Sequence, residues 1–147
     1  MASYRGRYTA QHLTAEFWGC APSLLADADA LASLLSYVVI EAGMRPVGAP
    51  TKLMVADGEA AWGTGASAMQ LLLDSNASIH GLVERRHAYL DLFSCKPFDG
   101  VDRLVCDVAG ALRATGWRWR IEDRTIGGSW WRRLWSRLTT PAALPKM

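Results

Sequence analysis

Three reactive side chains stand at short intervals in the middle of the sequence: Ser75, His80 and Cys95. A serine hydroxyl can attack a carbonyl carbon once a base takes its proton, and histidine titrates in the range where such a base works. A cysteine thiol can release or return a proton near neutral pH. These residue types are together typical of a site that combines a nucleophile, a base and a proton donor.

The segments around these residues predict the strands that would hold them. Apolar runs and alternating apolar and polar residues predict three consecutive strands, over residues 66–73, 76–83 and 87–95. Ser75, His80 and Cys95 would then lie near the ends of adjacent strands, within reach of one another. Each residue alone has a plainer interpretation, as a turn serine, a structural histidine or a small buried thiol. Their joint spacing, with Ser67 upstream, favours the functional interpretation.

The rest of the chain predicts a two-layer α+β domain. Alternation and helical periodicity predict strands over 11–19, 51–55 and 117–122 and helices over 23–43 and 101–112. Asp99 is available to cap the second helix. Helices placed between antiparallel strands predict one sheet with two helices packed on one face, formed by residues 1–128.

Length and composition exclude several classes of protein. The 147 residues suffice for one domain with its own core. No apolar run reaches the roughly eighteen residues that a membrane helix needs, and the polar N-terminus is not expected to be a secretory signal. Three cysteines at irregular spacing argue against a disulfide framework, so a cytoplasmic location is expected. No His or Cys pair stands at metal-ligand spacing, and no metal is expected.

The net charge of +2 comes from the C-terminal end of the chain. Residues 1–128 hold twelve Lys and Arg against fourteen Asp and Glu, whereas the tail, residues 129–147, holds four basic residues and no acidic one. The domain is therefore not expected to bind nucleic acid. On a helix, residues 130–138 would place Trp and Leu on one face and Arg on another, which suits a membrane surface or an acidic partner. Packing of the tail against the sheet or a dimer edge is the favoured interpretation.

The sequence around Ser75 resembles that of the prokaryotic S-adenosylmethionine decarboxylases. Their segment Glu-Ser-His-x-Ser-Ile-His-Thr-Trp-Pro-Glu corresponds to residues 74–84, and their Asp-Val-Phe-Thr-Cys strand corresponds to residues 91–95. Their Gly-Val-Ser-Gly corresponds to residues 65–68, and their early His, Tyr-Gly-Cys-x-Pro and Leu-Leu positions to residues 12–25. Four signatures thus occur in the family's order over about residues 6–125.

The resemblance implies a specific chemistry and assembly. Ser75 would attack the carbonyl of Asp74, the peptide would become an ester, and elimination with loss of ammonia would leave a pyruvoyl group at position 75. Ser67 and His80 would assist this self-cleavage. The pyruvoyl ketone would form a Schiff base with the substrate amine and accept electrons during decarboxylation, and Cys95 would return a proton. The implied enzyme is a homodimeric S-adenosylmethionine decarboxylase of spermidine biosynthesis.

Departures from the family pattern bear on the substrate more than on the reaction. Asp74 and Asn76 replace a glutamate and a histidine beside the cut, and Leu82 replaces a tryptophan expected to stack on adenine. Trp62 lies near another aromatic position of the family, and Glu84 keeps the acid that would bind ribose hydroxyls. Two alternatives stay open: a pyruvoyl-dependent decarboxylase of arginine or ornithine, and a non-catalytic paralogue that regulates a partner.

Overall fold

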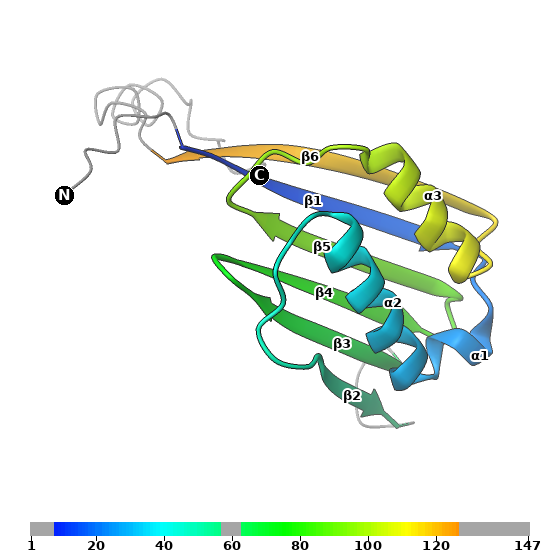
Figure 1. The fold of residues 1–147 in the computed structure, drawn as a ribbon. Coiled ribbons are helices and arrows are strands. Elements are labelled where there is room, and N and C mark those ends of the chain that lie inside the picture. The colour runs from blue at the N-terminus through cyan, green and yellow to red at the C-terminus, as the bar shows by residue number, and fades with distance from the viewer. Residues whose placement is uncertain (1–7, 57–62, 127–147) are drawn as a thin grey trace, which may run out of the picture.

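Six strands form one antiparallel sheet in the computed structural model, which describes residues 8–56 and 63–126. The strand order is β2-β3-β4-β5-β1-β6, so the first strand of the chain lies inside the sheet, beside the last (Figure 1). Along the chain the elements are β1 Tyr8–Trp18, α1 Pro22–Leu25, α2 Ala28–Glu41, β2 Thr51–Val55, β3 Gly65–Leu72, β4 Ser75–Leu82, β5 His87–Ser94, α3 Val101–Ala111 and β6 Gly116–Ile126. Within these described ranges, no helix is long and apolar enough to cross a membrane.

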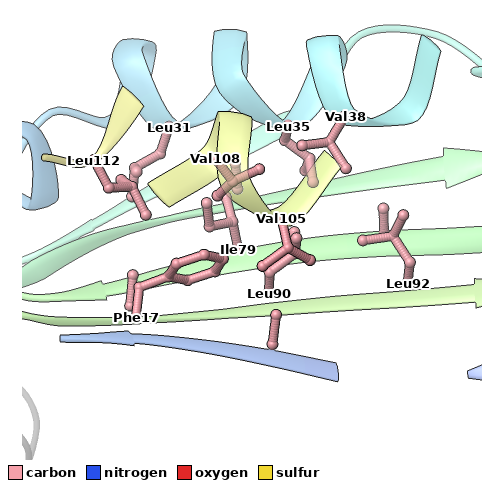
Figure 2. Close-up of a cluster of buried hydrophobic side chains, with 14 of the residues drawn as sticks. Phe17, Leu31, Leu35, Val38, Ile79, Leu90, Leu92, Val105, Val108 and Leu112 are labelled. Atoms are coloured by element: carbon pink, nitrogen blue, oxygen red, sulfur yellow. The ribbon is translucent and has the colours of Figure 1, made fainter. Parts of the chain in front are cut away.

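Helices α2 and α3 cover one face of the sheet and leave the other face, the open face, without helices (Figure 1). Successive side chains of a strand point to opposite faces, so each strand contributes one set to the core. On β5, Leu90 and Leu92 are fully buried, whereas Tyr89 on the open face is 40% exposed. Figure 2 shows the two layers meeting in one core that includes Phe17, Ile79, Leu90, Leu31, Leu35 and Val108. The expected two-layer α+β arrangement is confirmed.

The helices differ from expectation at their beginnings. The single helix expected over residues 23–43 is wrong, because the chain forms a short α1 and a separate α2. Asp27 lies between them, and its Oδ1 accepts hydrogen bonds from the backbone N–H groups of Asp29 and Ala30, both at 2.9 Å. The expectation that Asp99 caps α3 is also wrong, since Gly100 occupies the cap position with a φ of 65° and no side-chain cap bond.

Two hairpins join β3, β4 and β5, and they carry most of the predicted site. The three strands expected over residues 66–73, 76–83 and 87–95 are confirmed to within one residue at each end. Ser67 lies opposite His80 in the register, and Leu72 lies opposite Ser75. Trp62 and the tail, residues 129–147, lie outside the described residues.

Candidate active site

The backbone carbonyl of Asp74 lies in contact with the thiol of Cys95. Cys95 Sγ donates a hydrogen bond to this carbonyl oxygen over 2.8 Å, and the Cys95 backbone N–H donates to the Ser75 hydroxyl oxygen over 3.4 Å. The contact arises because the β3–β4 turn and the end of β5 lie side by side, since Asn76 pairs with Phe93 in the register. All three residues line a cavity of about 370 Å³.

Asp74 adopts a left-handed backbone conformation, with a φ of 63°. This conformation costs a non-glycine residue roughly 1 kcal/mol, although aspartate adopts it more readily than most. The hairpin requires it, because only Leu73 and Asp74 connect the paired residues Leu72 and Ser75. A strained peptide therefore precedes Ser75, and its carbonyl oxygen already has a donor. The same donor would stabilise negative charge that develops on this oxygen during an attack.

A second pair of reactive side chains lies toward the other end of β3 and β4. Ser67 Oγ is 2.8 Å from Nδ1 of His80, and the two residues are register partners on the open face. With its own proton on Nε2, His80 accepts the hydroxyl hydrogen at Nδ1 and can act as a base. The pair lines a cavity of about 410 Å³ whose other walls include Val55, Leu82 and Tyr89.

Ser75 and His80 do not lie together in one chain. They are five residues apart on β4, and a strand rises about 3.3 Å per residue, so about 17 Å separates them. The expectation that Ser75, His80 and Cys95 lie within reach of one another is therefore wrong for a single chain. The predicted residues form two groups: the Ser75 half, made of Asp74, Ser75 and Cys95, and the His80 half, made of Ser67 and His80.

The carboxylate of Glu84 is bound to Thr64, beside the His80 half. Both carboxylate oxygens lie 3.0 Å from the Thr64 backbone nitrogen, and the Thr64 hydroxyl donates to Oε1 over 2.5 Å. These bonds, the hydroxyl's foremost, hold the pKa of Glu84 below its usual value. Thr64 is not among the predicted site residues, and its only signal in the sequence is its position between two glycines.

Two polar pairs cross the open face between β5, β1 and β6. Nε2 of His12 on β1 is hydrogen-bonded to Oδ1 of Asp91 on β5, and Arg118 on β6 donates to the Glu16 carboxylate on β1 over 2.7 Å. Sequence analysis misses both pairs, because their partners are 79 and 102 residues apart and meet only once the strand order is known.

The remaining thiols lie outside both halves of the site. Cys20 is buried, and burial raises the pKa of its thiol, whereas Cys106 is exposed on α3. Within residues 8–56 and 63–126, no group of three His, Cys, Asp or Glu side chains is arranged to hold a metal ion.

Known proteins resemble this chain in both sequence and fold. A family model described as S-adenosylmethionine decarboxylase matches residues 11–125, a range that includes both halves of the site. The crystal structure of the adenosylmethionine decarboxylase from Aquifex aeolicus VF5 has a similar fold, with a TM-score of 0.65. The similarity covers 84% of this chain and 97% of that chain, at 18% sequence identity. No curated protein sequence matches.

Proposed function

Because the chain belongs to the S-adenosylmethionine decarboxylase family, a family of carboxy-lyases, we propose that it is a pyruvoyl-dependent S-adenosylmethionine decarboxylase that cleaves itself between Asp74 and Ser75. One observation carries the proposal: the Cys95 thiol donates to the carbonyl oxygen of Asp74 over 2.8 Å. This is the carbonyl that a self-cleaving Ser75 has to attack. A donor at that oxygen lowers the barrier to attack.

The Ser75 half supplies the groups for the first step of self-cleavage. The Ser75 hydroxyl oxygen, which accepts a hydrogen bond from the Cys95 backbone N–H, attacks the carbonyl carbon of Asp74. The Cys95 thiol stabilises the charge on the carbonyl oxygen as the peptide becomes an ester. The left-handed conformation of Asp74 raises the energy of the intact peptide and favours the same step. The C–N bond between residues 74 and 75 breaks, and the proton of the Ser75 hydroxyl passes to the freed nitrogen. Elimination of the ester releases residues 1–74 with a free carboxylate and leaves a dehydroalanine at position 75. Hydrolysis of its imine form by a water molecule releases ammonia and leaves a pyruvoyl group at position 75.

The proposed reaction needs both halves, so we infer that the active enzyme is a homodimer with composite sites. The Ser75 half of one protomer faces the His80 half of its partner, and a two-fold axis creates two equal sites. Ser67 and His80 then supply the base for the later proton transfers of self-cleavage. The separation of about 17 Å between Ser75 and His80 along β4 motivates this arrangement, because one chain alone leaves the base out of reach.

The open face offers the surface for such a pairing. Its β2–β3 side carries apolar side chains that are more than half exposed, namely Leu53 at 60%, Met69 at 58% and Leu71 at 70%. Beside β1, it carries the ion pair of Glu16 with Arg118 and the hydrogen-bonded pair of His12 with Asp91. An apolar area beside charged groups of both signs is suited to contact with a second copy of itself.

Decarboxylation would take place at position 75, between the two halves. The pyruvoyl group supplies an electron sink for the electrons left when carbon dioxide departs. Cys95, which adjoins position 75, returns a proton from its Sγ to the substrate carbon that has lost carbon dioxide. The cavity of about 410 Å³ beside His80 would hold the rest of the substrate. The product would serve spermidine biosynthesis in the cytoplasm.

A second candidate substrate follows from Leu82. This side chain lines the cavity of the His80 half, and an aliphatic side chain gives adenine no aromatic face to stack on. Arginine and ornithine have no adenine ring, so a leucine at position 82 would weaken their binding less than it weakens the binding of S-adenosylmethionine. Side-by-side release of carbon dioxide from S-adenosylmethionine, arginine and ornithine by the purified protein separates these candidates.

The intact mass of the purified protein tests self-cleavage. We expect two fragments, residues 1–74 and 75–147, with the second lighter by one ammonia than a chain that begins with serine. A single unbroken chain after long incubation would overturn the proposal and favour the non-catalytic regulatory paralogue.

Co-expression of two inactive variants tests the composite site. His80→Ala keeps the Ser75 half, and Ser75→Ala keeps the His80 half, so a mixed dimer contains one complete site. We expect the His80→Ala chain to be cleaved only when it is co-expressed with Ser75→Ala. Cleavage of His80→Ala expressed alone, or no cleavage in the mixture while the wild-type protein cleaves, would show that the halves do not meet across a dimer.

A further inference from the structure

The cavity beside the Asp74 carbonyl carries two cationic side chains, Arg45 and Lys96. Both residues line the cavity of about 370 Å³ together with Asp74, Ser75 and Cys95. Both are exposed, and within the described part of the chain neither side chain is paired with a carboxylate. Their positive charges can therefore bind a further anion in this cavity.

Backbone hydrogen bonds fix both cationic residues beside the peptide that would be cut. The Leu73 backbone N–H donates to the Arg45 carbonyl oxygen over 2.9 Å, so Arg45 is bonded to the residue that precedes Asp74. Lys96 directly follows Cys95, whose thiol and backbone N–H donate to the two residues of that peptide. Each cation is thus one residue away from a group in contact with the reacting atoms.

Self-cleavage creates a new negative charge at this place. The first step leaves an ester that joins Oγ of Ser75 to the carbonyl carbon of Asp74. In the elimination, a base removes the Cα proton of residue 75, and the electron pair of that bond forms the double bond between Cα and Cβ. The Cβ–Oγ bond breaks, and its electrons leave with Oγ. The leaving group is therefore the α-carboxylate of Asp74, where the intact chain has a neutral peptide.

The charges that already line the cavity give the two cations a definite task. Asp74 and Asp99 also line it, so two carboxylates balance Arg45 and Lys96 while the peptide is intact. The freed α-carboxylate adds a third negative charge. Among the described residues that line this cavity, no other side chain is cationic. Only Arg45 and Lys96 can therefore offset the repulsion among the three carboxylates there.

We propose that Arg45 and Lys96 bind the α-carboxylate of Asp74 as it leaves, and thereby speed the elimination step of self-cleavage. The inference rests on the proposed function, because this carboxylate forms only if the chain cleaves itself. Negative charge that develops on the leaving group as the Cβ–Oγ bond breaks is stabilised by cations that are already in place. An arginine can donate two parallel hydrogen bonds to a carboxylate, and a lysine acts as a compact point charge.

Neutral variants of the two cations test the inference in a time course of intact mass. Arg45→Gln and Lys96→Gln should each slow the appearance of the two fragments about threefold, and the double variant about tenfold, since exposed charge pairs contribute modestly. Arg45→Lys and Lys96→Arg keep the positive charge and should recover most of the lost rate. Arg103→Gln, which removes an exposed cation on α3 outside the cavity, is the matched control and should cleave normally.

Hydroxylamine separates the elimination from ester formation. It attacks the ester carbonyl, and it releases residues 1–74 as a hydroxamate and a second fragment that still begins with Ser75. This route does not expel a carboxylate from Cβ. We therefore expect the double variant to yield these fragments in hydroxylamine at least as fast as the wild-type chain. A double variant that is equally slow with and without hydroxylamine would overturn the inference, because the cations would then act before the elimination or on the fold.

The outcomes for the wild-type chain distinguish this inference from the proposed function. If the wild-type protein cleaves and the double variant cleaves equally fast, the inference is overturned and the proposed function stands. If the wild-type chain stays unbroken, both are overturned, because the carboxylate is never formed. Melting temperatures of the variants close to that of the wild-type protein would show that a slower elimination does not come from unfolding.

Discussion

Replacing Gly65 with alanine should push β3 and β4 apart and thereby misplace Ser67 and His80. A Cβ at position 65 would lie 1.9 Å from the carbonyl oxygen of Gly81 and 2.9 Å from its carbonyl carbon. Ordinary contact begins near 3.4 Å, so the two backbones have to move apart by about 1.5 Å. Overpacking typically costs about 1–3 kcal/mol, and we expect the upper end because backbone atoms cannot rotate away.

The loss of self-cleavage should exceed the loss of stability. Ser67 is two residues from Gly65, and its partner His80 adjoins Gly81, so parting the strands stretches their 2.8 Å hydrogen bond. We expect the melting temperature to fall by about 10 °C. A displacement of roughly 1 Å within a reacting group can slow a reaction about a hundredfold, which is the slowing we expect for cleavage of the folded variant.

A time course of intact mass gives the cleavage rate, and circular dichroism gives the melting temperature. Gly110→Ala is the matched control, because a Cβ there meets nothing within 4 Å. Gly110 lies inside α3, where alanine is favoured over glycine by up to about 1 kcal/mol, so this variant should be slightly more stable and cleave normally. If Gly65→Ala cleaved and melted like the wild-type protein, the reasoning from the close approach of β3 and β4 would be refuted.

Four further predictions concern the site and the tail. Cys95→Ala should slow self-cleavage about a hundredfold by removing the donor to the Asp74 carbonyl, whereas Cys106→Ala should cleave at the wild-type rate in the same intact-mass assay. Leu82→Trp should lower KM for S-adenosylmethionine about fivefold by adding a stacking face, and an unchanged KM would place the adenosyl group elsewhere. Because the folded pKa of Glu84 lies below 4.5, its bonds to Thr64 stabilise the fold above pH 4.5 and are lost as the pH falls through the lower folded pKa. The difference in melting temperature between the wild-type protein and Glu84→Gln should therefore disappear at acidic pH. A difference that persists at acidic pH would show that Thr64 does not depend on an ionised Glu84 carboxylate. Deletion of residues 128–147 should leave the cleavage rate unchanged, and loss of cleavage would show that the tail is part of the folded core.

The strands around the site could be predicted from sequence because they alternate cleanly and end in recognisable turns. Alternation of buried Ala88, Leu90 and Leu92 with more exposed neighbours sets both the limits of β5 and the face that carries Tyr89. The interruption between α1 and α2 at Asp27 could not be predicted from the apolar pattern, since apolar residues continue at helical spacing on both sides of it. Its cap becomes visible only when the Asp27 carboxylate is seen to accept from two backbone N–H groups.

The separation of the two halves of the site escaped prediction for a geometric reason. An interval of five residues is short in sequence but spans about 17 Å in an extended strand. Matching motif spacing identifies which residues belong to a site, and it does not establish whether one chain brings them together. Thr64 was not predicted as a site residue for another reason. Its bonds to Glu84 join residues 20 positions apart in the sequence and depend on the register of two strands.

A break between residues 74 and 75 would produce two polypeptides whose strands are interleaved in the sheet. The first polypeptide would contain β1, β2 and β3, and the second would contain β4, β5 and β6. Since β1 lies between β5 and β6, pairing with both along most of its length, the first piece is held inside the second. Neither piece could leave without unfolding the sheet. The mature protein would therefore stay whole without any covalent link between its parts, and maturation would free a new chain end at the site without loosening the fold.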